Sequence, residues 1–454
     1  MELSQEDTIV AIGTPMAESA VGMIRVSGPK TSQIAAEILN FSGSYESHRM
    51  SFGRIINGSE ALDEVMFCFM KSPKSYTGED LLEIYCHGSP LILIKIQELV
   101  LSKGAALASA GEFTQRAFLN GKMDLSQAEA VIDLIQAKTD LQRRCALYQL
   151  QGEFSKSVLA IRGMLFDVMV EAEANIDFPE YVPKGVTQDR LHDVLGHALL
   201  KTRELFSSVQ NERILKNGFQ VVLMGEPNVG KSSLLNALAE REVAIVTELP
   251  GTTRDAIHHS MSVNGIPVHL TDTAGIRSPE NIIEQKGIEI SDKKYQEADL
   301  VLWILDYAKV PDLESAKKYL SKKKPSFIVI NKIDLEENVQ IKDLEMKFSS
   351  IPIFKTSALT DLGIRQLRIE IERWVTSHTD IFETQVLLNE RHRKILTDSE
   401  NSILSALEAL QKGLGDDLVA GDLRYAIQKL DEILGREMNE EILDSIFSRF
   451  CIGK

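Results

Sequence analysis

The order of apolar and polar positions along the chain changes character several times, and each change predicts a domain boundary. Up to residue 122, short apolar runs such as TIVAIGTP, VGMIRVSG and LLEIYCHG are separated by Gly, Pro and Ser, which is typical of a small α+β domain. From residue 123 the spacing becomes helical, because Leu125, Ala128 and Val131 fall on one stripe of a helix. We therefore expect an α+β domain over 1–122 and the first part of a helical domain over 123–216.

A third pattern begins with the apolar run QVVLMG, which predicts a buried strand. Further strand-like runs, LVLWILD, SFIVINK and PIFKTSA, then alternate with helical segments, as in a doubly wound α/β domain. We assign this domain to residues 217–378, and residues 379–454 again show a helical pattern. The fold class predicted is therefore a multidomain α/β and α chain, in which an α/β domain is inserted into a discontinuous helical domain.

Composition narrows the class of protein. The 454 residues leave room for about three domains, and the four cysteines show no paired spacing, which argues against a disulfide framework or a zinc site. The formal net charge of −16 excludes a general, charge-driven nucleic-acid binder. Any RNA binding must therefore use a local basic patch, a conformation that depends on a ligand, or a partner that supplies the positive surface. The acidic start, MELSQEDTIV, is unlike a signal peptide, and we expect a cytoplasmic protein without a membrane anchor.

The segment GEPNVGKSSLLNAL follows the first strand of the α/β domain and opens a helix. Gly225 and Gly230 enclose four residues and precede Lys231 and Ser232, which is the spacing of a phosphate loop in its strand–loop–helix context. The backbone amides and the helix N-terminus of such a loop cradle phosphates. We expect Lys231 to reach the β- and γ-phosphates and the Ser232 hydroxyl to be a Mg²⁺ ligand.

Three further segments follow in the order of a nucleotide site. DTAG begins at Asp272, after a strand, where an aspartate can hold Mg²⁺ through water. NKID ends at Asp334, whose carboxylate can accept two hydrogen bonds from guanine N1–H and N2–H₂. Adenine has neither donor, so ATP would leave this carboxylate unpaired at a cost of about 1–3 kcal/mol. Ser357 and Ala358 would add a backbone contact to the guanine oxygen, and the set predicts GTP.

The residues available for hydrolysis are unusual. Ile276 follows DTAG where Ras-like GTPases have a glutamine that orients the attacking water, so this enzyme must place its water differently. From spacing alone, Glu284 is better explained as a solvated surface charge, and Asn228 as a turn residue. Thr252 or Thr253 could complete the Mg²⁺ shell, and because no arginine finger is evident, the transition-state charge needs another cation.

Over its whole length the chain resembles the MnmE (TrmE) family of tRNA-modification GTPases. The resemblance rests on the phosphate loop, the GTTRD segment, DTAGIR, NKID, GEFTQRAFLNGKMDLSQAEAVIDLI and the terminal FCIGK. It implies an N-terminal folate-binding and dimerisation domain, a two-segment helical domain and an inserted Ras-like G domain. It also implies K⁺-stimulated GTP hydrolysis linked to G-domain dimerisation. A flavoprotein partner, MnmG, would form a heterotetramer with this protein. It would join in adding a carboxymethylaminomethyl or related group at C5 of the wobble uridine of certain tRNAs.

The same resemblance implies roles for particular residues. It assigns K⁺ to Asn228, Thr247, Leu249 and Thr252, and Mg²⁺ to Ser232 and Thr253. It makes Glu284 the catalytic residue that organises water, in place of a surface charge. The expected GTP-binding residues are Asn228, Val229, Gly230, Lys231, Ser232, Ser233, Thr247, Glu248, Leu249, Pro250, Gly251, Thr252, Thr253, Asp272, Thr273, Ala274, Gly275, Asn331, Lys332, Asp334, Ser357 and Ala358.

The resemblance further implies a site for 5-formyltetrahydrofolate, or a related tetrahydrofolate, at Arg25, Glu83, Lys122 and Lys454. A carboxylate suits the N–H donors of a pterin, and Arg or Lys suits the anionic glutamate tail. The terminal IFSRFCIGK would then be docked to complete the pocket; alternatively, its aromatic residues only end a core helix and Lys454 hangs free. The family usually has glycines after TP, whereas this chain has Ala17 and Ser19 in TPMAESA, so this loop is expected to differ in shape.

Two other functions fit parts of the pattern. A ribosome-assembly GTPase would share the G domain but would need a basic RNA-binding module, which the acidic balance and the FCIGK terminus oppose. A folate-dependent one-carbon transferase would use Cys451 as its nucleophile and the G domain only for regulation. A lone cysteine beside aromatic residues is more often a small packed hydrophobe.

Overall fold

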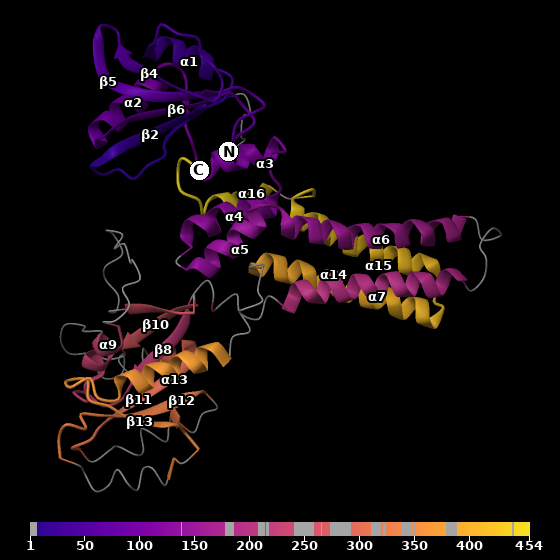
Figure 1. The fold of residues 1–454 in the computed structure, drawn as a ribbon. Coiled ribbons are helices and arrows are strands. Elements are labelled where there is room, and N and C mark those ends of the chain that lie inside the picture. The colour runs from indigo at the N-terminus through magenta and orange to yellow at the C-terminus, as the bar shows by residue number, and fades with distance from the viewer. Residues whose placement is uncertain are drawn as a thin grey trace. The chain divides into compact units, whose positions relative to one another are not determined.

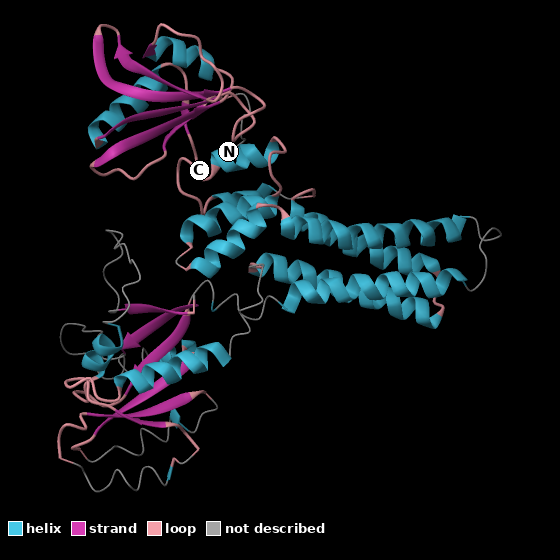
Figure 2. Cartoon of the chain, in the orientation of Figure 1, coloured by secondary structure: helices cyan, strands magenta, loops and turns pink. Residues whose placement is uncertain are grey.

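The computed structural model describes residues 7–137, 139–177, 186–207, 214, 218–239, 258–264, 266–272, 292–309, 319–320, 324–336, 347–348, 350–377, 388–437 and 440–454. The chain forms two compact units. The first contains Met1–Ile135, Leu147–Thr202 and Lys394–Lys454, and the second contains Gln136–Ala146 and Arg203–Arg393. Figures 1 and 2 show the mixed sheets and the long helices of these units.

The first unit begins with a seven-stranded sheet of order β3-β4-β5-β6-β2-β1-β7. Its strands are β1 (Ile9–Ile12), β2 (Ser19–Ser27), β3 (Leu39–Asn40), β4 (Arg49–Asn57), β5 (Glu60–Met70), β6 (Leu81–Gly88) and β7 (Ala106–Leu107). Helices α1 (Thr31–Ile38) and α2 (Pro90–Ser102) cover one face, as Figure 1 shows. Alternation along the strands explains this, because the buried residues Ile24, Phe67 and Ile84 pack with these helices in one core.

The rest of the first unit is helical. Its helices are α3 (Glu112–Leu119), α4 (Leu125–Gln136), α6 (Glu153–Asp177), α7 (Val186–Ser207), α14 (Glu390–Lys412), α15 (Asp416–Leu434) and α16 (Glu440–Phe447), with α5 (Asp140–Leu150) at the division between the units. Long helices from both sequence segments lie together, since α6 packs along α15. Leu125 and Ala128 of the predicted stripe are fully buried, which confirms the helical periodicity there. A helical domain built from two segments was predicted, and the structure has this arrangement.

The second unit contains a six-stranded sheet of order β13-β12-β11-β8-β10-β9, parallel except for β9. Its elements are β8 (Phe219–Met224), α9 (Lys231–Ala239), β9 (His258–Val263), β10 (Ile266–Asp272), β11 (Leu300–Asp306), β12 (Ser326–Asn331), β13 (Ile353–Lys355) and α13 (Ile364–Ser377). Strands β11 and β12 are buried at every position, which explains their continuous apolar runs. The predicted α/β fold is therefore confirmed.

Among the helices that the structure describes, none has both the length and the apolar character that a bilayer crossing requires.

Candidate functional site

The phosphate loop joins the end of β8 to the start of α9 through two glycines whose backbone other residues could not adopt. Gly225 has φ 144°, and a Cβ there would lie 2.3 Å from the carbonyl oxygen of Ile304. Gly230 has φ 92°, and its Cβ would lie 2.4 Å from Nδ2 of Asn331. Neither position accepts a side chain. The loop backbone is therefore packed against β11 and the Asn331 loop, which fixes its shape.

Lys231 lies buried beneath the loop that precedes it. Its ammonium donates hydrogen bonds to the carbonyl oxygens of Gly225 at 2.8 Å and Glu226 at 2.6 Å. Burial lowers the pKa of Lys231 from its ordinary value, with the nearby carboxylates of Asp272 and Glu226 acting in the opposite direction. Because neutral carbonyl groups compensate only part of the desolvation, an anion beside this ammonium would be strongly favoured. This is the position that a phosphate-binding lysine requires.

Ser232 and Asp272 meet at the edge of the sheet. The Ser232 hydroxyl donates to Oδ2 of Asp272 at 2.7 Å, and Asp272 is the last residue of β10. A hydroxyl and a carboxylate are hard oxygen ligands of the kind Mg²⁺ takes, with water and phosphate oxygens for the remaining positions. These two residues therefore fit a Mg²⁺ ion, and they could bind it directly or through water.

The base-reading loops are joined by Asn331 and Ser357. Nδ2 of Asn331 donates to the carbonyl of Val229 at 3.1 Å, and its Oδ1 accepts from the amide of Ala358 at 3.2 Å. Ser357 donates to Oδ1 of Asp334 at 2.5 Å, which orients the predicted guanine-reading carboxylate. One side chain thus connects the phosphate loop, the NKID loop and the loop after β13.

Lys332 adds a second connection to the phosphate loop. Its ammonium donates to the carbonyl of Asn228 at 2.8 Å and pairs with Oδ2 of Asp306 at 2.7 Å. Asn228 has φ 64°, a backbone conformation that asparagine tolerates better than most residues, and its side chain is exposed. Turn geometry therefore accounts for an asparagine here, and the exposed amide remains accessible to a cation.

Several predicted residues lie outside the described part of the chain. They are Thr247, Glu248, Leu249, Pro250, Gly251, Thr252, Thr253, Thr273, Ala274, Gly275, Ile276 and Glu284. The K⁺ ligands other than Asn228, the second Mg²⁺ ligand and the proposed catalytic glutamate belong to this group, so these assignments stay predictions.

A second candidate site lies on the sheet of the first unit, at Arg25 and Glu83. The two residues are direct partners across β2 and β6, and the Arg25 guanidinium donates to Oε1 of Glu83 at 3.0 and 2.6 Å. The rings of Tyr76 and Phe113 each lie 5.6 Å from this guanidinium. An arginine, a carboxylate and two aromatic rings form a surface suited to a flat, polar heterocycle.

Tyr85 extends the same row of β6. Its hydroxyl donates to Oε2 of Glu83 at 2.6 Å, and burial together with this carboxylate raises the pKa of Tyr85 to about 12. The phenol therefore stays a hydrogen-bond donor at neutral pH and orients Glu83. Sequence reasoning missed Tyr76, Tyr85 and Phe113, although Tyr85 is in the same LLEIYCHG run as Glu83.

The C-terminal residues reach this site. The Arg25 guanidinium donates to the carbonyl oxygen of Gly453 at 3.1 Å, and Ile452 forms a bridge with Ala110. Gly453 has φ 93°, and a Cβ there would lie 2.8 Å from the carbonyl of Ile12. The terminus is therefore docked against the sheet, as one of the two predictions for IFSRFCIGK required.

The aromatic residues before the terminus end a core helix, as the alternative prediction for IFSRFCIGK required. Phe447 and Phe450 are buried and pack with Leu125 and Val131. Cys451 is exposed, so the expectation that it is a small packed hydrophobe was wrong. The physical reason is that the two phenylalanines already fill the core, and the chain leaves it at Cys451.

Lys122 contacts a different part of the domain. Its ammonium donates to the carbonyl of Pro73 at 2.9 Å, in the loop of residues 72–80 that also carries Tyr76. Lys454, in turn, is held by a backbone hydrogen bond from its amide to the carbonyl of Cys451 at 3.3 Å. Of the four predicted folate residues, Arg25 and Glu83 are therefore in contact, Lys454 follows the residue bound to Arg25, and Lys122 is linked through the loop.

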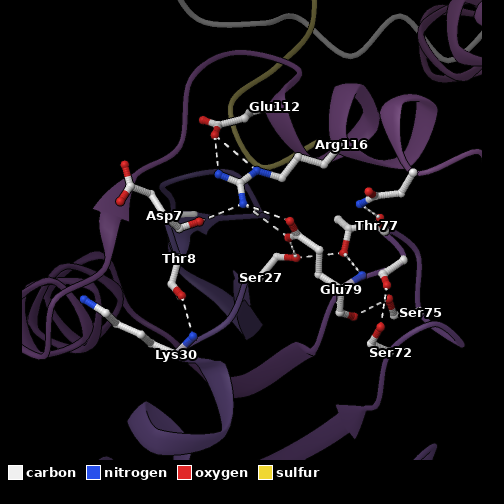
Figure 3. Close-up of polar contacts among 12 residues, drawn as sticks. Asp7, Thr8, Ser27, Lys30, Ser72, Ser75, Thr77, Glu79, Glu112 and Arg116 are labelled. Atoms are coloured by element: carbon white, nitrogen blue, oxygen red, sulfur yellow. Dashed lines mark hydrogen bonds and ion pairs between the residues drawn. The ribbon is translucent and has the colours of Figure 1, made fainter. Parts of the chain in front are cut away.

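A polar network around Arg116 fixes that loop, as Figure 3 shows. Arg116 pairs with Glu112 at 2.8 Å and with Glu79 at 3.2 Å, and it donates to the carbonyl of Asp7 at 2.8 Å. Glu79 also accepts from the hydroxyl of Ser27 at 2.8 Å. The network joins α3, the end of β2 and the loop, so it holds the loop against the second candidate site. The spacing of Glu112 and Arg116 in GEFTQRAF was the only signal for it in the sequence.

The TPMAESA loop carries side chains where the family usually has glycines, and the expected difference in its shape stays a prediction. Ala17 and Ser19 are exposed, and Ser19 is the first residue of β2, where it pairs with Gly88. A Cβ on Gly88 would lie 2.1 Å from the Ser19 hydroxyl, so the two strands approach closely here. The Ser19 side chain therefore packs directly against the backbone at the end of β6.

The phosphate loop, Ser232 with Asp272, and the Asn331–Asp334 loop together define a P-loop GTPase. Two family descriptions match the chain: "MnmE helical domain" over residues 125–451 and "GTP-binding protein TrmE N-terminus" over residues 8–122. The chain belongs to the MnmE family of tRNA modification GTPases, and it is a GTPase.

Curated relatives match it over nearly the whole length. The tRNA modification GTPase MnmE of Acetivibrio thermocellus is 39% identical over 99% of this chain and 100% of its own length. MnmE of Bacillus pumilus is also 39% identical, over 99% of this chain and 100% of its own, and MnmE of Staphylococcus aureus (strain Newman) is 37% identical over 99% of each.

Solved structures match a smaller part of this chain than the curated relatives do. A variant of Aquifex aeolicus Era bound to GDP·AlF4⁻ is 27% identical, covers 41% of this chain and 66% of that chain, and has a TM-score of 0.29. The G domain of the T. maritima FeoB iron transporter is 26% identical, covers 35% of this chain and 99% of its own, and has a TM-score of 0.28. Overlaps with such low TM-scores add nothing to the family assignment.

Proposed function

We propose that this GTPase modifies C5 of the wobble uridine of certain tRNAs, together with a flavoprotein partner of the MnmG type. The group added would be carboxymethylaminomethyl or aminomethyl, with its one-carbon unit taken from a tetrahydrofolate. The observation that carries the folate part is the contact of Arg25 with both Glu83 and the docked Gly453. Family membership supports the tRNA part, and we infer that the reaction takes place in the cytoplasm.

GTP hydrolysis would proceed without the usual glutamine. Lys231 would neutralise the β- and γ-phosphates, and Ser232 and Asp272 would hold Mg²⁺, with Thr253 as a further ligand. We propose that K⁺, bound by the Asn228 side chain with Thr247, Leu249 and Thr252, supplies the cation that replaces an arginine finger. Glu284 would organise the attacking water when two G domains pair.

The folate site would use the surface around Arg25. Glu83 can accept the N–H donors of a pterin, and Tyr76 and Phe113 offer aromatic faces for stacking. For the ligand to bind, Glu83 would have to accept hydrogen bonds from the ligand in place of some that it now accepts from Arg25. Lys122 and Lys454 would pair with anionic groups of the ligand.

A homodimer through the N-terminal domain is supported by the open face of its sheet. Phe52 and Met66, which are partners across β4 and β5, are 58% and 41% exposed, and Met50 nearby is 48% exposed. Large apolar side chains gathered on one uncovered sheet face indicate a contact surface. A second copy of this domain would cover them.

Two experiments test the proposal. Mass analysis of tRNA nucleosides from cells lacking the gene should show loss of the modified wobble uridine; normal modification would contradict the tRNA function. In a titration with 5-formyltetrahydrofolate, Arg25→Ala and deletion of Lys454 should weaken binding while GTP hydrolysis stays near normal. The control is Arg54→Ala, since Arg54 forms a similar cross-strand pair with Glu64 on the same sheet. Equal folate affinity in all variants would refute the site.

A further inference from the structure

A cavity of about 600 Å³ lies within the first unit, beside Lys122. It is formed by the end of α3, the segment from α3 to the start of α4, α6, the C-terminal end of α15 and α16. Its lining residues include the apolar Phe118, Leu159, Leu434 and Leu443 and the cations Lys122 and Arg436. Leu159 is 38% exposed, so its side chain is accessible from the cavity. The cavity therefore combines apolar walls with positive charge.

The two cations retain capacity for a ligand. Lys122 is exposed and uses one of its three N–H donors on the carbonyl of Pro73. Arg436 shares the carboxylate of Asp431 with Arg162, at 3.4 Å against 2.8 Å for Arg162, so two guanidinium groups face one carboxylate. Arg436 is 50% exposed, and it is the more weakly held of the two. An anion in the cavity would complete its charge pairing.

The lining also contains one carboxylate, Asp124. Its Oδ1 accepts hydrogen bonds from the Ser126 hydroxyl at 2.8 Å and the Gln127 amide at 3.0 Å, at the start of α4. This carboxylate serves as a helix cap and stabilises the positive helix N-terminus. Two carboxylates therefore oppose the charge that Lys122 and Arg436 offer to a ligand: Asp124, which already caps α4, and Asp431, which Arg162 also shares.

Two elements connect the cavity to the folate site. Helix α3 carries Phe113 beside the Arg25 guanidinium and Phe118 in the cavity wall, separated by a rise of about 7.5 Å. The loop of residues 72–80 carries Tyr76 beside Arg25 and Pro73 at Lys122, three residues apart and so within about 10 Å. The cavity is therefore adjacent to the predicted folate residues.

We propose that this cavity binds the oligo-γ-glutamyl tail of a polyglutamylated folate. The inference rests on the proposed folate site and extends it. Each added γ-glutamyl unit brings one carboxylate and two methylene groups, which match the alternation of cations and apolar walls. Lys122 pairs with the first carboxylates, and Arg436 pairs with those of the following units. Because the chain as a whole carries a net charge of −16, a polyanionic tail needs such local cations to bind.

A sugar–phosphate backbone is the competing anion for this cavity. A tRNA strand would need a longer run of cations, and it would leave the apolar walls of Phe118 and Leu443 unmatched. The amphipathic lining favours the γ-glutamyl tail, and tRNA binding is measured as one outcome of the test.

The test compares 5-formyltetrahydrofolate with one and with three glutamate units, titrated into the full-length protein by calorimetry. The measured quantity is the ratio of the two affinities. We expect the triglutamate to bind about 5–10-fold more tightly to the wild type, the gain typical of one or two accessible charge-assisted bonds. Arg436→Ala should bring the ratio close to one, and Arg436→Lys should leave an intermediate ratio. Thermal unfolding of both variants shows whether they remain folded.

The matched control is Arg424→Ala. Arg424 lies on α15, is 68% exposed and pairs with Glu173 at 2.6 Å, but it is not part of the cavity lining. This variant should keep the full ratio. If Arg424→Ala and Arg436→Ala lower the ratio equally, the effect is one of general charge and the proposal is wrong.

Other outcomes separate the two proposals. If both ligands bind the wild type equally well, the tail site is refuted while the folate site stands. If neither ligand binds, both are refuted. If the ratio is large but insensitive to Arg436, the tail lies elsewhere. If Arg436→Ala leaves the ratio intact and weakens tRNA binding, the cavity serves the phosphate backbone.

Discussion

Replacing Arg116 with methionine should destabilise the N-terminal domain more than any surface change. The Arg116 and Glu112 side chains are 6% and 7% exposed, and that of Glu79 is 16% exposed. Arg116→Met keeps most of the side-chain volume but leaves two shielded carboxylates without their cation. It also leaves the carbonyl of Asp7 without the hydrogen bond that Arg116 donates.

The size of the effect follows from burial. Removing one partner of a buried ion pair costs about 3–5 kcal/mol, because the remaining charge is desolvated and uncompensated. Since Glu79 retains the hydrogen bond from Ser27, and Glu112 retains the one from the Ser109 amide, we expect about 4 kcal/mol. That corresponds to about a thousandfold rise in the opening equilibrium of the elements that the network joins.

Hydrogen exchange measures this locally in the intact chain, which has several domains and need not unfold in one step. Peptides covering residues 72–80 should exchange faster in Arg116→Met. Tryptophan fluorescence provides an internal control, because Trp303 and Trp374 both lie in the second unit. The unfolding transition of that unit, followed by their fluorescence, should be unchanged.

A rescue variant separates charge from packing. Glu79→Gln with Glu112→Gln, added to Arg116→Met, removes both charges and keeps an acceptor on each side chain, so at least half of the lost protection should return. Unchanged exchange in the single variant would show that the network contributes little. A triple variant no better than the single one would show that lost packing, not charge, is responsible.

Three further predictions concern the other sites. Asp334→Asn should shift nucleotide preference from GTP to xanthosine triphosphate, because the asparagine amide offers a donor to the base; unchanged preference in a competition assay would mean that Asp334 does not read it. GTP hydrolysis should be much faster in K⁺ than in Na⁺ at matched ionic strength; Asn228→Ala should abolish this difference, whereas Glu284→Ala should lower turnover by about 10²-fold or more with G-domain pairing retained. The exposed Cys451 should be the first thiol to react with a disulfide reagent at pH 8, because burial raises the pKa of Cys86 to about 11; persistence of the fast phase in Cys451→Ser would refute this.

The G domain could be predicted well because its signals are local. Asp272 and Asn331 are the last residues of β10 and β12, and Lys231 begins the helix that follows the loop after β8. Parallel strands bring these ends to one edge of the sheet. The strand order is not needed for this prediction, because any parallel arrangement of these strands places the loops that follow them at the same edge of the sheet. The hydrogen bonds of Asn331 to two other loops are the physical result.

The proposed folate surface could be predicted only in part, because its residues are distant in sequence. Arg25 and Gly453 are in contact although 428 positions separate them, and no periodicity in either segment indicates this. Tyr76 reaches Arg25 from a loop whose shape depends on the Arg116 network, which joins three separate segments. Here the resemblance to a family supplied the residues, and only the structure supplied their aromatic neighbours.

The contact between Arg25 and Gly453 has a consequence for how a ligand would act within the first unit. Arg25 belongs to the sheet, whereas Gly453 follows α16. Phe447 at the end of α16 and Phe450 just after it pack on α4. A ligand that draws Glu83 away from Arg25 frees donors on the guanidinium, and these can bind the ligand or strengthen the bond to the terminus. By linkage, a ligand that strengthens the contact between Arg25 and Gly453 would bind more tightly when the terminus is docked, by the same free energy. If the proposed folate binds at Arg25, docking of the terminus on the same arginine would couple its binding to the helical segment that ends there.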